Sequence, residues 1–400
     1  CRFCSAGTSF MNVLVVIAFY APAYRYGGPV RSLAALCEGL TALDVNVRVL
    51  TTNADGNSRL NVPLGEPLRR NGVEVIYTPL PRQRLIPASF FYAPALNRAF
   101  RDHRAWANIA YLDVWWTHAA LCGAAAQRVG IPYIVPLRGQ LLPYGWRGSG
   151  LKKWLYLVVI GRRFLNEAAA VHCTSEAEAA AYRTLGFRPP TLVIPNAIDL
   201  TRFAGEPPPQ GWRARLNIPT TAPLILFVGR LHPKKRPDLA VHMLSLPHAH
   251  VILVGADEGG MIPALRDQAQ RLEGGERFHW LNVLDGADLA AAYAAADLLI
   301  MPSEPESENF GNVILEAAAC GLPFVATDDI PAAALLAAHD AGQAIPFDRN
   351  RFYAAAKALL TDRPTLRAMG ERGRIAVHAF APQRVAMEMA NACEQLCASS

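Results

Sequence analysis

Long apolar runs and a high density of charge are both missing from this sequence. No stretch of about 18 uncharged apolar residues occurs, so no membrane-spanning helix is predicted. Charged residues make up 18% of the chain and hydrophobic residues 52%, which is typical of a folded globular protein and excludes a disordered one. The 400 residues are more than one core comfortably serves, so two domains are predicted.

Cysteine and glycine patterns of several familiar classes are also missing. The eight cysteines form no disulfide framework, and the Cys1-Arg-Phe-Cys4 pair has no second pair with which to bind zinc. No G-x-G-x-x-G opens a helix after a strand, which argues against a dinucleotide-dependent dehydrogenase. The apolar run Met11–Phe19 lacks the flanks of a secretory signal, so we expect a cytoplasmic protein.

Basic charge is concentrated in the first half of the chain. Residues 1–205 contain 22 lysines and arginines against 11 acidic residues, whereas residues 206–400 contain 17 and 22. The first half is therefore expected to meet an anionic membrane, a phosphate-bearing acceptor or nucleic acid. Nucleic acid is the weakest of these partners, because no recognisable motif interleaves aromatic with basic residues.

Two series of apolar strands alternating with helices indicate the fold class. Met11–Phe19 is predicted to be a buried parallel strand, and a glycine loop, a helix and a second strand complete a βαβ unit. A strand is also predicted at Trp115–His118. After Pro207-Pro208-Pro209 the pattern restarts with a strand at Leu224–Gly229. The predicted parts are a non-native or disordered segment at 1–10, Rossmann-like doubly wound domains at 11–205 and 206–380, and a final helix at 381–400 that crosses back to the first domain.

The strongest chemical signal lies in the segment 302–321. Glu308 falls in a predicted loop, and Glu316 follows eight residues later in an apolar helical run. A fully helical connection would separate them by about 12 Å, which suits two ends of one extended ligand. Favourable carboxylates at a helix N-terminus explain Glu308 without a ligand. They do not explain Glu316, because a carboxylate in an apolar run needs a partner or a ligand.

A second signal combines a strand end with two cations. The predicted strand ends at Gly229, and Arg230 and Lys235 occupy the loop before the next helix. Open α/β sheets bind ligands beyond the carboxyl ends of their strands, where two cations can neutralise a diphosphate leaving group. The alternative is a solvated basic loop.

Together these segments resemble glycosyltransferase family 4. Further stretches of the chain match the family, from about Met11 to the C-terminal helix: Tyr26–Leu33, Thr117-His118, Thr174–Glu178, Pro195–Asp199 and Gly321–Thr327. The resemblance implies the GT-B fold, in which two Rossmann-like domains face a central cleft. It also implies a retaining, metal-independent glycosyltransferase without a cofactor, whose donor is a nucleotide-diphosphate sugar.

The resemblance assigns roles residue by residue. It implies that the residues near the reacting sugar and diphosphate are His118, Glu308, Arg230 and Lys235. It implies that the remaining donor contacts come from Gly27, Gly28, Arg138, Gly229, Gly255, Val283, Asn309, Phe310, Gly311, Asn312 and Glu316. Glu316 would hold the ribose hydroxyls, and the backbone near Val283 would meet the base. From the residues alone, His118 is equally well explained as a strand cap in the core.

Three departures from the family pattern affect the substrate prediction. Ala197 and the pair Asp328-Asp329 stand where the family usually has glycine, and Asn282 stands near the expected base site. These changes spare the carboxylates and cations, but they weaken any transfer of base or sugar preference. The loop 137–144 resembles a subgroup associated with cell-surface polysaccharide assembly, and Arg138 within it is either a phosphate contact or an ordinary surface arginine.

The segment 144–164 combines tryptophan and tyrosine with lysine and arginine. It is interpreted either as an interfacial helix at the cytoplasmic membrane face or as a helix packed in the first domain. The predicted function is hexose transfer to a saccharide or lipid-linked acceptor in O-antigen, capsule or exopolysaccharide assembly. The alternatives are a GT-B nucleotide-sugar epimerase or hydrolase, and a non-catalytic nucleotide-sugar-binding partner.

Overall fold

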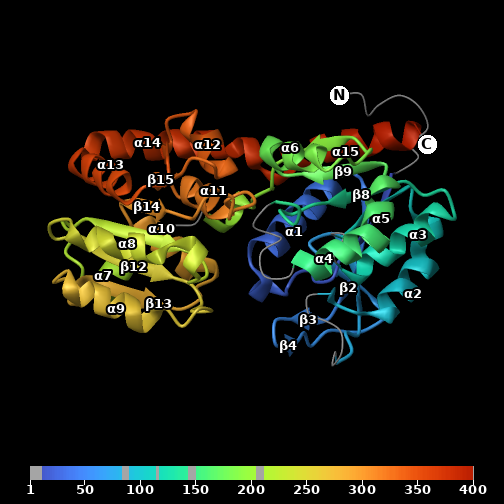
Figure 1. The fold of residues 1–400 in the computed structure, drawn as a ribbon, viewed down its shortest axis with the longest axis horizontal. Coiled ribbons are helices and arrows are strands. Elements are labelled where there is room, and N and C mark those ends of the chain that lie inside the picture. The colour runs from blue at the N-terminus through green and yellow to red at the C-terminus, as the bar shows by residue number, and fades with distance from the viewer. Residues whose placement is uncertain (1–10, 83–89, 114–116, 143–149, 204–210, 400) are drawn as a thin grey trace. The chain divides into compact units, whose positions relative to one another are not determined.

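The computed structural model describes residues 11–82, 90–113, 117–142, 150–203 and 211–399 and divides into two compact units (Figure 1). The first unit comprises residues up to 197 together with those from 382 onward, and the second comprises Ile198–Ala381. The boundary therefore falls upstream of the predicted one at residue 205. The predicted terminal segment 1–10 and the prolines 207–209 lie outside the described residues.

The first unit is built on a mostly parallel sheet. Its strands and helices are β1 (Asn12–Val16), α1 (Gly28–Thr41), β2 (Asn46–Thr52), β3 (Ala54–Asp55), β4 (Ser58–Arg59), β5 (Pro67–Arg70), β6 (Val73–Thr78), α2 (Pro94–His103), β7 (Ile109–Leu112), α3 (Cys122–Gln127), β8 (Tyr133–Pro136), α4 (Gly150–Tyr156), α5 (Arg162–Asn166), β9 (Ala170–Cys173), α6 (Glu176–Thr184), β10 (Thr191–Val193) and α15 (Pro382–Ala398). Short 3-10 turns lie at Tyr24–Tyr26, Arg104–Trp106 and His118–Leu121, and a π-helical turn, η6, at Leu157–Gly161. The strand order of the eight-stranded sheet is β10-β9-β8-β7-β1-β2-β6-β5, and among its described strands only β5 pairs antiparallel. β3 and β4 form a separate antiparallel pair.

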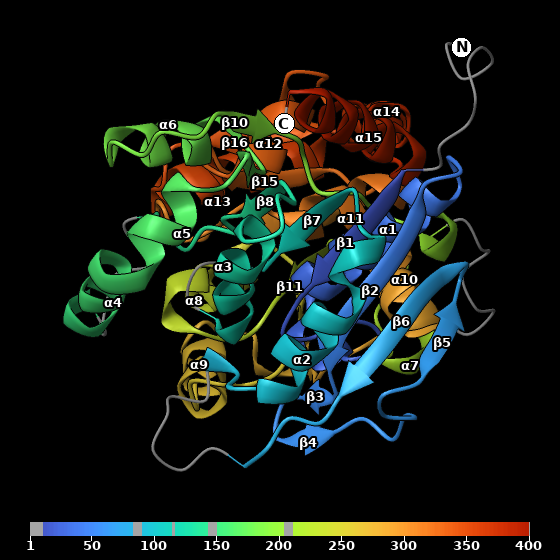
Figure 2. The same ribbon diagram turned by 90° about the vertical axis from the view of Figure 1, so that its right-hand side faces the viewer.

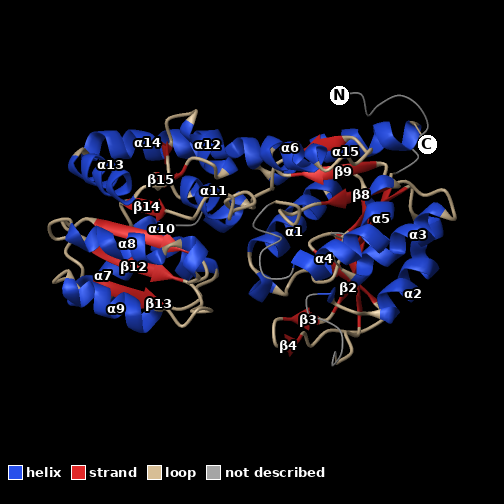
Figure 3. Cartoon of the chain, viewed as in Figure 1, coloured by secondary structure: helices blue, strands red, loops and turns tan. Residues whose placement is uncertain are grey.

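Alternating side chains of β1 explain why both faces of this sheet are covered by helices (Figure 3). Val13 and Val15 enter one apolar core, whereas Leu14 and Val16 enter the other, and all four are at most 3% exposed. A strand buried on both faces is continuously apolar, which is the pattern that predicted it.

Of the predicted strand Trp115–His118, Trp115 and Trp116 lie outside the described residues, and the described residues, Thr117 and His118, are not in a strand. The strand at this place, β7, ends at Leu112, and His118 opens a 3-10 turn. Asp113 directly follows the strand, and its carboxylate accepts a hydrogen bond from the backbone N–H of Ala18 at 3.0 Å. This bond ties the loop after β7 to the loop after β1.

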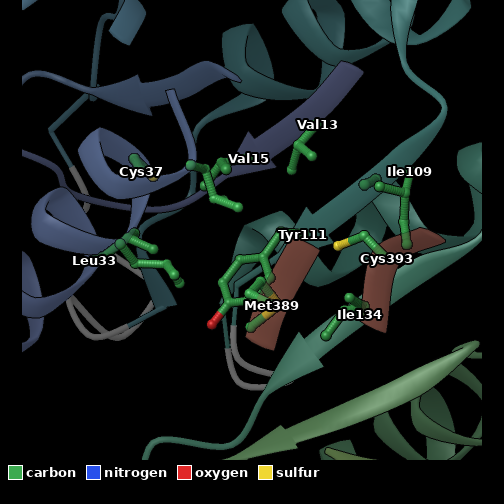
Figure 4. Close-up of a pocket in the computed structure, with 12 residues that line it drawn as sticks. Val13, Val15, Leu33, Cys37, Ile109, Tyr111, Ile134, Met389 and Cys393 are labelled. Carbon is green, nitrogen blue, oxygen red and sulfur yellow. The ribbon is translucent and has the colours of Figure 1, made fainter. Parts of the chain in front are cut away.

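The final helix, α15, packs on α1 within the first unit. A cavity of about 10 Å³ remains between these helices and the sheet, lined by apolar side chains and by Cys37 and Cys393 (Figure 4). Such a volume holds at most one water, and a dry apolar lining is ordinary core packing. This cavity is therefore no substrate site.

The second unit repeats the architecture with a six-stranded parallel sheet in the order β13-β12-β11-β14-β15-β16. Its elements are α7 (Trp212–Arg215), β11 (Leu224–Val228), α8 (Pro237–His242), β12 (His250–Val254), α9 (Ile262–Arg271), β13 (Phe278–Leu281), α10 (Gly286–Ala295), β14 (Leu298–Met301), α11 (Asn312–Ala319), β15 (Phe324–Thr327), α12 (Pro331–Ala337), β16 (Gly342–Ile345), α13 (Arg349–Thr361) and α14 (Arg363–Ala376). 3-10 turns lie at Leu200–Phe203 (η7), Pro233–Lys235 (η8), Met243–Ser245, Gly275–Arg277 and Val377–Phe380.

Each sheet has one point at which the strand order reverses. In the first unit it lies between β1 and β7, and in the second between β11 and β14. Ligands of doubly wound sheets bind in the crevice beyond the carboxyl ends of the strands at this point. A ligand site is therefore expected at the loops that follow these four strands. In the described part of the chain, no helix has the length and apolar character needed to cross a bilayer.

The contact between α1 and α15 can be tested at Gly39. A Cβ atom at Gly39 would lie 2.4 Å from the carbonyl oxygen of Pro382, at the start of α15. We expect Gly39→Ala to lower the free energy of unfolding by about 1–3 kcal/mol, as overpacking does. Urea denaturation measures this cost. The control is Gly211→Ala, where a Cβ meets nothing within 4 Å; equal effects at the two glycines would contradict the packing argument.

Candidate active site

An ion pair joins the two loops that flank the reversal point of the second sheet. Lys235 ends the 3-10 turn η8 after β11, and Glu308 lies in the loop between β14 and α11. The Lys235 ammonium contacts Glu308 Oε1, and the side chains are 15% and 11% exposed. The two residues were predicted from separate sequence motifs, and the structure brings them together.

Further hydrogen bonds fix this arrangement. Ser303 Oγ donates to Glu308 Oε1 at 2.9 Å, and the backbone N–H of Glu304 donates to the carbonyl of Lys234 at 2.7 Å. Burial lowers the pKa of Lys234, which the neighbouring Glu308 carboxylate partly offsets. Lys234 and Ser303 were not among the predicted site residues, because in sequence they read as one more lysine and an ordinary loop serine.

Glu316 has a partner that the sequence does not reveal. It lies on the second turn of α11, and the hydroxyl of Tyr293 on α10 donates a hydrogen bond to Glu316 Oε2 at 2.7 Å. Tyr293 is 1% exposed, and burial followed by the charge of Glu316 raises its pKa well above the usual value. The hydroxyl therefore stays protonated and holds the carboxylate in one orientation.

The loop before α11 is held in a specific shape. Gly311 caps the helix at a φ of 94°, where a Cβ would lie 2.5 Å from Ile330 Cγ2, so a side chain is excluded on both counts. Phe310 is buried, and its carbonyl accepts from the N–H of Ala332. Among the described residues, the Asn309 Oδ1 and Ser307 Oγ atoms are buried without a hydrogen-bond partner. Asn312 begins the helix, whose N-terminal amides favour an anion or hydroxyl groups.

Other predicted contacts of the second unit have local explanations. A Cβ at Gly255 would lie 1.9 Å from the carbonyl oxygen of Gly229, so backbone packing between β11 and β12 already requires Gly255. Arg230 pairs with Glu258 at 3.0 Å on the surface. Val283 is exposed after β13, and its N–H donates to the side chain of Asn282. Arg230 thus lies in the loop with Lys235 but has its own counterion.

In the first unit, Arg138 lies beside the glycine loop. Gly27, at a φ of 77°, precedes α1, which begins at Gly28. Arg138 donates from Nη1 to the carbonyl of Pro29 at 3.3 Å, in the first turn of that helix. A cavity of about 20 Å³ lies against Arg138, Ser32 and Thr174. A guanidinium next to a helix N-terminus is suited to an anion.

Glu178 supports the Arg138 loop from the core. This carboxylate is 2% exposed on α6 and accepts from the backbone N–H groups of Gly139 and Thr174 and from the Thr174 hydroxyl. Burial raises its pKa and these hydrogen bonds lower it. The motif at 174–178 was noticed only as part of the family resemblance; the spacing alone does not identify Glu178 as a partner of a loop about 40 residues away.

His118 opens the 3-10 turn that follows β7 in the chain, and it is buried. β7 is one of the two strands at the reversal point of the first sheet. His118 is 3% exposed, and neither ring nitrogen has a hydrogen-bond partner among the described residues. Tyr92 meets the imidazole edge-on at a centroid distance of 4.9 Å. Burial lowers the pKa of His118. A buried imidazole that lacks a partner is more consistent with a site residue than with a satisfied strand cap.

The described residues also bear on the prediction that no metal ion is needed. The described residues contain no group of three or more histidine, cysteine or acidic side chains suited to a metal ion. Trp115, Trp116 and the start of the predicted interfacial segment, residues 144–149, lie outside the described residues.

Two Rossmann-like domains, each with its candidate residues at the reversal point of a parallel sheet, define the GT-B class of fold. Comparison with solved structures agrees. Sucrose-phosphate synthase from Thermosynechococcus elongatus matches with a TM-score of 0.78 and 24% identity over 98% of this chain and 100% of that one. Anabaena HepE, solved with UDP and glucose, matches with a TM-score of 0.72 and 20% identity over 96% and 100%. At this identity the likeness establishes the fold alone.

Sequence comparison identifies the family. Residues 27–197 match the glycosyl transferase 4-like domain, and residues 210–376 match glycosyl transferases group 1. The chain belongs to glycosyltransferase family 4. The D-inositol 3-phosphate glycosyltransferase of Kineococcus radiotolerans is 34% identical over 204 residues, covering 45% of this chain and 46% of that relative. The enzyme of that name from Streptomyces bingchenggensis is 27% identical over 328 residues, covering 76% and 70%. The chain thus spans about half the length of the first of these relatives.

The Tyr293–Glu316 contact predicts a specific effect on nucleotide affinity. Tyr293→Phe removes only the hydroxyl that orients Glu316, and hydrogen bonds to charged groups contribute about 1.5–3 kcal/mol. We expect the affinity for the preferred nucleotide diphosphate, measured by calorimetry, to fall about tenfold or more. The control is Tyr133→Phe, whose hydroxyl donates to the carbonyl of Phe164 in the other unit. Undiminished affinity in Tyr293→Phe, or the same loss in the control, would remove this role.

Proposed function

We propose that this protein is a hexosyltransferase that moves a hexose-type sugar from a nucleotide-diphosphate sugar to a saccharide or lipid-linked acceptor with retention of anomeric configuration. The Lys235–Glu308 pair carries the proposal, because it places a cation and a carboxylate side by side beyond the carboxyl ends of β11 and β14. Family membership and the UDP-sugar complexes of structural neighbours support the donor class.

In this proposal the residues of the second unit bind and activate the donor. Glu316, oriented by Tyr293, accepts hydrogen bonds from the ribose hydroxyls. Glu308 and the backbone at Phe310 and Gly311 bind the sugar hydroxyls. Lys235, released from Glu308 by the ligand or shared with it, neutralises the diphosphate, with Arg230 as a second cation. Preorganised charge of this kind stabilises a leaving group at the moment of bond cleavage.

The transfer step proposed here is a front-face substitution. The bond from the anomeric carbon to the diphosphate oxygen breaks, and a bond from that carbon to the acceptor oxygen forms on the same face. The acceptor hydroxyl proton passes to the departing phosphate. His118, whose pKa is lowered by burial, then serves as a contact for the sugar rather than as an acid. No cofactor and no metal ion enter this scheme.

Arg138 and the start of α1 support an acceptor, or a donor, with a phosphate in the first unit. Several relatives carry a phosphorylated polyol or sugar in their names, among them D-inositol 3-phosphate glycosyltransferase and sucrose-phosphate synthase. We further propose that the protein acts in cell-surface polysaccharide assembly in the cytoplasm, with peripheral contact to an anionic membrane where a lipid-linked acceptor would lie. The basic first half of the chain supports this location.

Nucleotide binding is the first test. A thermal-shift series with UDP, GDP, ADP and their hexose conjugates, with and without magnesium, is expected to show selective stabilisation by one nucleotide without a metal requirement. Product analysis then separates transfer from the alternatives, since an epimerase or hydrolase turns over the donor without an acceptor. Stabilisation without turnover on any acceptor would favour the non-catalytic alternative. Inversion at the anomeric carbon, observed by NMR, would refute retention.

Lys235 offers the sharpest mutational test of the chemistry. Lys235→Ala is expected to lower the transfer rate by about 10²–10³-fold, as the loss of one preorganised charge does. Lys235→Arg retains the charge opposite Glu308 and should recover part of the rate. Lys357→Ala, at an exposed lysine of α13, is the matched control. A rate in Lys235→Ala equal to that of the control would exclude the diphosphate role.

A further inference from the structure

One helical segment of the first unit has large apolar side chains on its outer face. It consists of α4, the π-helical turn η6 and α5, which form one continuous segment from Gly150 to Asn166 (Figure 2). The exposed side chains are Leu151 (80%), Trp154 (56%), Leu155 (57%), Val158 (49%) and Val159 (66%). Their spacing of i, i+3, i+4, i+7 and i+8 places them on one face, which we call the outer stripe.

The outer stripe is not explained by packing within the unit. Other residues of the same helix already face the core: Phe164 and Leu165 are buried, and Tyr156 and Leu157 pack against the same cluster. The stripe contributes five of the 14 exposed large apolar side chains among the described residues, and the other nine are scattered over both units. Exposed apolar surface concentrated in this way marks an interaction site rather than ordinary surface composition.

The charge at the end of the stripe indicates the partner. Arg162 follows Val158 and Val159 at i+4 and i+3, so it continues the same face, and Arg163 beside it is 75% exposed. Between Leu151 and Arg163 the sequence contains four lysines and arginines and no acidic residue. The first acidic side chain, Glu167, already pairs with Arg163 at 2.8 Å. A second copy of the stripe would therefore offer these cations no opposite charge, whereas anionic lipid headgroups would.

The length and composition fit a helix that lies in the membrane interface. Gly150–Asn166 is shorter than the roughly 20 residues that a spanning helix needs. A tryptophan and aliphatic side chains on one face, with arginine stems that reach back to the headgroups, are typical of interfacial helices. Tyr156, a tyrosine of the predicted interfacial segment 144–164, packs against the core instead.

We propose that the outer stripe of α4 and η6 inserts into the interface of an anionic bilayer, with Arg162 and Arg163 at the phosphate level. The inference rests on the proposed function only for the reason why the protein would bind a membrane, namely to reach a lipid-linked acceptor. The binding itself depends on the described surface and is measurable without sugar transfer.

Vesicle co-sedimentation tests the proposal with the full chain. We expect the protein to sediment with vesicles of equal parts phosphatidylcholine and phosphatidylglycerol, and much less with phosphatidylcholine alone. Leu155→Gln combined with Val159→Gln should weaken binding more than tenfold. The control is Leu335→Gln combined with Ile375→Gln, two exposed apolar residues of the second unit, which should bind as the parent does. Arg162→Gln combined with Arg163→Gln should abolish the preference for phosphatidylglycerol.

Several outcomes would overturn the proposal. These are absence of binding by the parent protein, equal binding by the stripe variant, or a dimer in analytical ultracentrifugation that the stripe variant dissociates. The thermal shift with nucleotide should be the same in the stripe variant and the arginine variant as in the parent, since these residues lie in the other unit from the proposed nucleotide site. Vesicle binding without any nucleotide shift would leave the membrane surface intact and refute the proposed function instead.

Discussion

The largely buried ion pair between Lys235 and Glu308 is the interaction on which the organisation of the second unit's site depends. A pair with so little exposure contributes little net stability, because desolvation offsets the attraction, but losing either partner leaves an uncompensated charge. The pair therefore matters because it positions two loops, not because it adds stability. It holds the loop after β11 against the loop after β14, and the hydrogen bond from Glu304 to the Lys234 carbonyl locks the same two loops through their backbones.

Sheet topology explains why two residues predicted from separate motifs lie side by side. Parallel strands buried on both faces are continuous apolar runs, so β11 and β14 are recognisable, and in a doubly wound sheet their carboxyl ends meet at the reversal point. Polar residues just beyond both runs must then be neighbours. The same reasoning located Gly27 and the start of α1 after β1, although the roles of all these residues stay predictions.

The sequence could not reveal contacts made by residues that look like ordinary core. Tyr293 sits in an alanine-rich helix and reads as a packing residue, and only the tertiary structure shows its hydroxyl on Glu316. Glu178 reads as one of two acids in the first turn of a capped helix. The strand expected at Trp115–His118 has a related cause, because bulky aromatic residues raise strand propensity. The strand that precedes this place, β7, ends at Leu112, and His118 opens a 3-10 turn.

The residues that depart from the family pattern are also part of the site's architecture. The carboxylate of Asp329, where the family usually has glycine, accepts a hydrogen bond from the backbone N–H of Glu306, whose φ of 59° lies in the left-handed region. Burial raises the pKa of Asp329, and the neighbouring Asp328 and Glu308 carboxylates add to the effect. A side-chain contact after β15 thus helps to shape the loop that bears Glu308. A loop fixed in this way loses little conformational entropy when a ligand binds.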